Sequence, residues 1–238
     1  MIDSEARTTR LLLGEFGASA MLTLMVFLSG TGLVQVGVGS AGAALLGSVI
    51  LGFGVGLIIW TFGPLSGAQG NPLITLVAIA LGRQRVTTTF VRIVAQVIGM
   101  GLAVLVLSAI WPNLTAGPSY RRVHSLADGV AAFGFTVVAL GVANQRNVRV
   151  PVALGAFATA SFWMTGRATL GNPLLSFAVL CLTTPQDITA SSVAEGIAGA
   201  VGGAAVGAVV ALFLFPHTRE SAAVLLFCPV ETTTRRSG

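Results

Sequence analysis

Charge is scarce in this chain, and several residue types that build sites in soluble proteins are rare or missing. The 238 residues include no lysine, two cysteines and two histidines, and only 9% of them are charged. Soluble domains carry about 25% charged residues, so the composition excludes that class. Cys181 and Cys228 form no C-x-x-C pattern, and His124 has no second histidine nearby. We therefore expect neither a disulfide nor a metal site.

Apolar residues dominate instead. The hydrophobic fraction is 54%, thirty residues are glycine, and the mean hydropathy is +0.89, values typical of an integral membrane protein. All 13 basic residues are arginines, and we expect them singly or in pairs at the ends of apolar runs, where they orient spanning helices. This distribution argues against nucleic-acid binding and makes the lipid bilayer the expected partner.

Six apolar runs predict spanning helices, each of which needs about 20 residues. They lie near residues 11–33, 43–63, 88–110, 126–143, 150–165 and 191–215. Two further runs, 72–81 and 173–182, are too short to cross and are predicted to be half-helices. The predicted fold class is an all-α membrane protein with six transmembrane helices and two re-entrant half-helices.

One short block occurs twice, as Gly70-Asn71-Pro72-Leu73 and as Gly171-Asn172-Pro173-Leu174. Asparagine is a favoured N-cap and proline is favoured at the first helical position, so Pro72 and Pro173 are predicted to begin the two half-helices. A helix start inside a membrane exposes unpaired N–H groups, which is costly unless the start lines a polar cavity. The repeated block therefore indicates a pore or a binding site.

The two halves of the chain have the same order of elements. Each contains a span with one acid, a span rich in small residues, a half-helix and a further span. Because three spans are an odd number, the second copy is predicted to be inverted, so that the half-helices meet near the midplane. The arginine-rich side is predicted to be cytoplasmic, with both termini inside. We therefore predict a cytoplasmic N-terminus (residues 1–10), a channel domain (residues 11–216) and a cytoplasmic tail (residues 217–238). Within the channel domain the two repeats are residues 11–110 and 124–215.

Two acids lie inside predicted spans. A carboxylate in the bilayer is costly, so Glu15 and Asp128 need partners. We expect Glu15 to face the interior and to accept hydrogen bonds from irregular backbone, with a place near the headgroups as the alternative. Gln96 lies in the third span, where two interpretations fit equally well: its side chain makes a hydrogen bond between packed helices, or it lines the pore.

Two motifs and the two acids carry a family resemblance. The motifs are Gly63-Pro64-Leu65-Ser66-Gly67-Ala68-x-x-Asn71-Pro72 and Gly171-Asn172-Pro173, and the acids are Glu15 and Asp128. Together they resemble the aquaporin, or major intrinsic protein, family over nearly the whole chain to Phe215. The stretch 128–135 and the approach Phe162-Trp163-x-Thr165 look most like the bacterial aquaglyceroporins encoded with arsenic-resistance genes.

The resemblance implies a homotetramer in the cell (inner) membrane, in which each six-span protomer has its own pore. Asn71 and Asn172 match the family asparagines whose side-chain amides donate to the permeating molecule. The implied partner is a small neutral solute. The resemblance implies no cofactor, no metal and no enzyme activity.

The chain departs from the family pattern at the pore. Leu73 and Leu174 stand where the family has alanine after Asn-Pro, and Leu175 stands where it has an arginine. Counting from the motifs places four residues at the selectivity filter, namely Leu51, Ala160, Thr169 and Leu175. We predict a wide, apolar constriction for glycerol-like polyols or undissociated arsenite, with water permeation left open. Arg167 is expected in solvent or at a headgroup rather than in the pore as a substitute charge.

Two other functions fit the same pattern. Broken helices at the midplane also occur in secondary transporters, which would use Glu15 and Asp128 for ion coupling. Alternatively, the leucines at the constriction would plug a non-conducting tetramer. Flux that is insensitive to proton or sodium gradients would separate a channel from a transporter.

The tail contains a second, fainter resemblance. The stretch from Ala223 through Cys228 to the Arg236-Ser237 pair is similar to the opening strand and phosphate loop of low-molecular-weight phosphatase-type arsenate reductases. However, its loop has one residue too many and the rest of such a domain is missing. We therefore expect a disordered tail, a vestige of a fused segment at most, without catalytic activity.

Overall fold

The structure is a computed structural model that describes residues 2–111, 125–143, 149–182 and 188–215. Its regular elements are helices throughout these residues: α1 (Ile2–Phe27), a π-helical turn (Leu28–Gly32), α2 (Leu33–Gln35), α3 (Ser40–Ser66), α4 (Pro72–Ala80), α5 (Val86–Ile110), α6 (Ser125–Ala143), α7 (Arg149–Thr165), α8 (Pro173–Leu182) and α9 (Ala190–Leu214). The predictions about His124 and about the tail with Cys228 lie outside the described residues.

Five helices in the described part of the chain are long and apolar enough to cross a membrane: Glu5–Phe27 within α1, and the whole of α3, α5, α6 and α9. The fifth predicted span corresponds to α7, which has 17 residues. The half-helices α4 and α8 have 9 and 10 residues. At about 1.5 Å per residue, neither half-helix crosses a hydrocarbon core about 30 Å thick.

The first helix begins earlier than predicted. The apolar pattern starts at Leu11, whereas α1 starts at Ile2. Hydropathy marks only the part of a helix that lies in the bilayer, and residues 2–10 contain no glycine or proline that would end the helix before that point.

In each half of the chain two helices cross closely at a glycine, and the two glycines occupy equivalent positions. A Cβ atom on Gly99 of α5 would collide with the carbonyl oxygen of Phe16 in α1, and one on Gly203 of α9 would collide with that of Gly129 in α6. Phe16 follows Glu15, and Gly129 follows Asp128. The close α1–α5 and α6–α9 crossings therefore have the same register relative to the buried acids.

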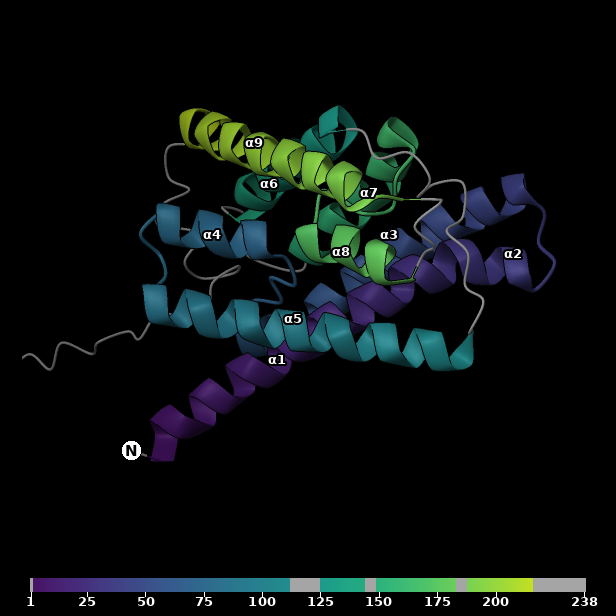
Figure 1. The fold of residues 1–238 in the computed structure, drawn as a ribbon. Coiled ribbons are helices and arrows are strands. Elements are labelled where there is room, and N and C mark those ends of the chain that lie inside the picture. Colours follow the sequence, from purple (N-terminus) through teal and green to yellow (C-terminus); the bar gives the residue numbers. More distant parts are fainter. Residues whose placement is uncertain (1, 112–124, 144–148, 183–187, 216–238) are drawn as a thin grey trace, which may run out of the picture.

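The half-helices lie between the two halves. Figure 1 shows α4 and α8 between the α1–α5 pair and the α6–α9 pair, and the two short helices contact α5, α9 and each other. On another side of the molecule α3 packs against α7. This arrangement brings the starts of both half-helices into the interior of one bundle.

Candidate pore at the two half-helix starts

The loop before α4 is shaped by backbone that few residues adopt. Gly67 ends α3 with φ of 87°, and Ala68 and Gly70 also have positive φ, at 47° and 52°. Asn71 then returns to extended backbone, and its Oδ1 accepts a hydrogen bond of 2.9 Å from the N–H of Leu73. The side chain of Asn71 thus caps a helix whose first residue is Pro72, which has no N–H to satisfy.

The loop before α8 repeats this design. Leu170 and Gly171 have positive φ, at 54° and 63°, and Asn172 Oδ1 accepts a hydrogen bond of 3.1 Å from the N–H of Leu174. A Cβ atom on Gly171 would lie 2.6 Å from backbone and side-chain atoms of Ala132. Glycine is therefore required at this position, both for its φ and for the close approach of the loop to α6.

The two loops are bonded directly to each other. Asn172 Nδ2 donates a hydrogen bond of 2.9 Å to the carbonyl oxygen of Gly70, 102 residues earlier in the sequence. Asn71 and Asn172 are both buried. Asn172 retains its second amide N–H, and no described residue accepts a hydrogen bond from Asn71 Nδ2. The site therefore brings together two helix N-termini and two asparagine side chains, each with an amide N–H that is available to donate a hydrogen bond.

Glu15 holds the first loop in place. Its side chain is 0% exposed, and its two carboxylate oxygens accept hydrogen bonds from the backbone N–H groups of Gln69 and Gly70, at 3.2 and 3.0 Å. Gln96 Nε2 donates to the same carboxylate at 2.7 Å and to Thr75 Oγ1 of α4 at 3.0 Å. Glu15 therefore lies in the interior rather than at the headgroups, and Gln96 makes hydrogen bonds between helices.

Arg92 was missed by the sequence analysis. The expectation that every arginine stands at the end of an apolar run is wrong for this residue, which lies in the second turn of α5 and is 1% exposed. Its Nη1 donates to Glu15 Oε1 at 2.7 Å and to the carbonyl oxygen of Ser66 at 2.5 Å. The available signal was spacing, because Arg92 and Gln96 are four residues apart and share one helix face, as expected for partners of a buried acid.

Asp128 occupies the matching position in the second half, with different partners. Its Oδ1 accepts hydrogen bonds from Arg167 Nε at 3.0 Å and from Thr169 Oγ1 at 2.7 Å, whereas its Oδ2 is buried without a hydrogen bond. Arg167 is 3% exposed. The expectation that Arg167 lies in solvent or at a headgroup is therefore wrong, because the ion pair with Asp128 holds its side chain inside the protein.

Comparisons with known proteins show the family to which this chain belongs. The sequence profile of the major intrinsic protein family matches residues 3–145, more than half of the chain. The chain belongs to the major intrinsic protein family. It is 31% identical over 154 residues to aquaglyceroporin AqpS of Rhizobium meliloti, an alignment that covers 61% of this chain and 66% of that relative, just under two thirds.

The fold of this major intrinsic protein is shared with a solved structure. The X-ray structure of the aquaglyceroporin from Plasmodium falciparum matches with a TM-score of 0.71 and 14% identity, over 89% of this chain and 98% of the other. The predicted fold is thereby confirmed: six transmembrane helices, with α7 as the fifth, and two re-entrant half-helices, α4 and α8. At this identity the match shows the fold alone.

The four residues assigned to the filter differ in their surroundings. Leu51 and Leu175 are buried in one hydrophobic cluster, and Thr169 is buried against Asp128. Ala160, in contrast, is exposed on α7. The buried face of α7 is formed by other residues, which are Val150, Leu154, Gly155, Ala158, Ser161 and Phe162, and the place of Ala160 in the filter stays a prediction. Successive helical residues are rotated by about 100°, which places Ala160 nearly opposite Ala158.

The leucines after the two asparagines are buried in different surroundings. Leu73 packs in a cluster with Ala132 of α6 and with Ala200 and Ala204 of α9, so its side chain contacts the helices of the second half. Leu174 belongs to the main cluster that also contains Leu175. The small residues on α6 and α9 leave room for the side chain of Leu73.

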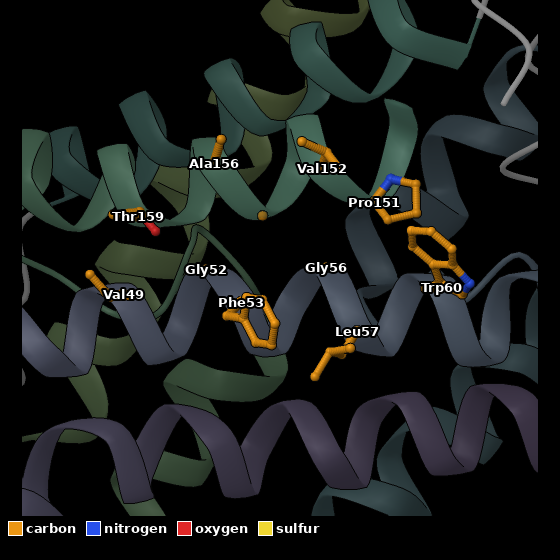
Figure 2. Close-up of a pocket in the computed structure, with 11 residues that line it drawn as sticks. Val49, Gly52, Phe53, Gly56, Leu57, Trp60, Pro151, Val152, Ala156 and Thr159 are labelled. Atoms are coloured by element: carbon orange, nitrogen blue, oxygen red, sulfur yellow. The ribbon is translucent and has the colours of Figure 1, made fainter. Parts of the chain in front are cut away.

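A groove on this major intrinsic protein lies away from the half-helix starts. It has a volume of about 440 Å³ and runs between α3 and α7 (Figure 2). Exposed side chains such as Phe53, Trp60 and Val152 line it, so it opens on the outer face of the bundle. It is not part of the site formed by Asn71 and Asn172.

Proposed function

We propose that this protein is a passive transmembrane channel for small neutral solutes. The observation that carries the proposal is the hydrogen bond between Asn172 and Gly70, which joins the starts of two half-helices inside the bundle. Each helix N-terminus has a partial positive charge and unpaired N–H groups. Such a site favours solutes that accept hydrogen bonds and repels cations.

The proposed substrates are glycerol-like polyols and undissociated arsenite, with water as a further candidate. The relatives named as aquaglyceroporins support polyols, and the resemblance of residues 128–135 to channels encoded with arsenic-resistance genes supports arsenite. Leu51 and Leu175 support an apolar filter without the family arginine. Ala158 replaces Ala160 as the proposed contribution of α7, because it is the alanine on the buried face.

We further propose a homotetramer in the cell (inner) membrane, with both termini in the cytoplasm and without enzyme activity. The arginines before the first span, between α4 and α5, and at the start of α7 support this orientation: Arg7, Arg10, Arg83, Arg85 and Arg149. Residues 11–216 would form the channel domain and 217–238 a cytoplasmic tail.

The ion pairs favour a channel over a secondary transporter. A transporter would need a carboxylate that exchanges an ion with the substrate pathway. Glu15 and Asp128 are instead paired with Arg92 and Arg167. Such pairing is expected for acids that support the loops structurally.

The decisive experiment is a solute panel in proteoliposomes. Stopped-flow measurements of water, glycerol, urea and arsenite are expected to give flux of glycerol and arsenite that does not respond to proton or sodium gradients. Leu175→Arg, reconstituted in parallel at equal protein density, is expected to lower the flux of both solutes, because it adds bulk and charge at the constriction. Water flux without any solute flux would contradict the substrate proposal, and no flux of any kind would favour the plugged tetramer.

A further inference from the structure

We propose that a buried water molecule is bound between Asp128 and the loop before α8, and that Asp128 positions this loop through the water. The partners of the water are Oδ2 of Asp128 and the backbone N–H groups of Leu170 and Gly171. Such a site would hold the loop in place whatever solute the protein conducts.

The first half of the chain shows what a fully paired acid looks like. Each carboxylate oxygen of Glu15 accepts two hydrogen bonds. Oε1 accepts from the N–H of Gln69 and from Arg92, and Oε2 accepts from the N–H of Gly70 and from Gln96. An ionised carboxylate has about four positions at which it accepts hydrogen bonds, so Glu15 has all of them filled.

Asp128, the equivalent acid of the second half, is only half paired. Within the described part of the chain it accepts two hydrogen bonds, from Arg167 and Thr169, and both are on Oδ1. Its Oδ2 has no partner, although the residue is 1% exposed. A buried charged acceptor without a donor is costly, and ordered water is a common partner for such atoms in proteins.

The loop before α8 carries unpaired donors at the matching positions. Leu170 and Gly171 are the two residues before Asn172, and in the first loop the equivalent two N–H groups donate to Glu15. Leu170 and Gly171 are buried, and neither N–H donates a hydrogen bond to any residue that the structure describes. A Cβ atom on Gly171 would lie 2.7 Å from the carbonyl oxygen of Asp128, so the loop contacts α6 at the acid itself. Buried N–H groups are nearly always paired, and here both donors lie in the loop that contacts the unpaired acceptor.

The length of the side chain explains why the second loop is not bonded directly. Aspartate is shorter than glutamate by one methylene group, which removes about 1.5 Å of reach. Asp128 also has its Oδ1 fixed by Arg167 and Thr169. A bridging molecule restores the connection, because it forms one hydrogen bond of about 2.8 Å to Oδ2 and another of about 2.9 Å to an N–H group.

The chemistry of the partners selects water as the bridging molecule. The ligand must donate a hydrogen bond to a carboxylate oxygen and accept one from a backbone N–H. A metal cation cannot accept a hydrogen bond from an N–H, and the guanidinium of Arg167 on the same carboxylate repels it. An anion is repelled by Asp128. Water is neutral, both donates and accepts, and typically makes about three hydrogen bonds at buried sites.

The test is an experimental structure of the protein at a resolution that shows ordered water, with two reciprocal variants. In the parent we expect a water within about 3.2 Å of Asp128 Oδ2 and of at least one of the two N–H groups. Asp128→Glu should bond the loop directly and lose this water. Glu15→Asp should gain a water between the acid and the first loop. Glu5→Asp is the matched control, because Glu5 is an exposed acid of α1, and it should change neither loop.

Hydrogen–deuterium exchange gives a second readout in solution. An N–H bonded to water is less protected than one bonded to a carboxylate. The amides of Leu170 and Gly171 are therefore expected to exchange about tenfold faster than those of Gln69 and Gly70, and Asp128→Glu should slow them by about the same factor. Four results would overturn the inference: a direct bond from Oδ2 to the loop in the parent, no density between them in a map that shows other buried waters, a water that persists in Asp128→Glu, or equal exchange in the two loops.

Discussion

Asn172 Nδ2 donates a hydrogen bond of 2.9 Å to the carbonyl oxygen of Gly70, and this bond joins the two halves of the chain at their half-helix starts. Asn172 also caps its own half-helix through Oδ1, so one side chain fixes a helix start and the distance to the opposite loop. Asn71 caps α4 in the same way but makes no such bond to the second half. The pore is thus symmetric in its caps and asymmetric in the bond that closes it.

This asymmetry predicts unequal effects of removing the two amides. Asn71→Ala loses a helix cap, at a cost of about 1 kcal/mol in stability. Asn172→Ala loses a cap and also leaves the buried Gly70 carbonyl without its donor, which adds about 1 kcal/mol or more. Thermal unfolding of both variants in the same detergent is expected to show the larger decrease in Tm for Asn172→Ala, and an equal decrease would contradict the role of the cross-repeat bond.

The Glu15–Arg92 pair predicts that single variants are worse than the double variant. Glu15→Gln leaves a buried arginine without its counter-charge, at a cost of about 3–5 kcal/mol. Glu15→Gln combined with Arg92→Gln removes both charges and should recover part of this loss. A double-mutant cycle on the yield of monodisperse protein and on Tm measures the coupling, and additive effects would show that the pair is not coupled.

The helix crossing of the second half predicts a sharp contrast between neighbouring glycines. Gly203→Ala puts a Cβ against the carbonyl of Gly129 and forces α6 and α9 apart, a change that costs about 1–3 kcal/mol. A Cβ on Gly202 meets nothing within 4 Å, so Gly202→Ala should be neutral or slightly stabilising, since alanine favours helix more than glycine does. Comparison of the two Tm values checks this, and equal destabilisation would contradict the α6–α9 packing described above.

The orientation of α7 predicts which alanine affects permeation. Ala158 is fully buried, whereas Ala160 is exposed on the opposite side of the helix. Ala158→Leu adds volume toward the interior and should lower glycerol flux severalfold, and Ala160→Leu should leave it unchanged. Flux per folded protein in proteoliposomes distinguishes the two, and the reverse order would restore Ala160 to the filter.

Hydropathy and helix capping predict most of the fold. The spans and both half-helices lie where the apolar runs and the Asn-Pro starts place them, because bilayer thickness and unsatisfied backbone are strong, local constraints. The start of α1 was placed too late, since a helix continues into water without a change in its local preferences.

The candidate site could be predicted in its residue types but not in its pairing. A lone acid in a span requires a partner, but nothing in the local sequence of Glu15 shows that Arg92, 77 residues away, supplies it. The polar turn around Arg167 predicts that its side chain lies in solvent. In the structure the side chain is buried instead, because it donates a hydrogen bond to Asp128 on α6. Counting residues from the motifs places Ala160 in the filter but does not show which face of α7 it occupies, and in the structure that face is exposed.

The sequence by itself determined the two half-helix starts, because Asn71-Pro72 and Asn172-Pro173 specify a cap and a first helical residue through bonds that span only two positions. The tertiary structure decided the contacts around those starts. These are the pairing of each acid with its arginine, the choice of the buried face of α7, and the hydrogen bond from Asn172 to Gly70. These contacts join segments up to 102 residues apart. They depend on the close crossings at Gly99 and Gly203, and those are fixed only when all the helices pack together.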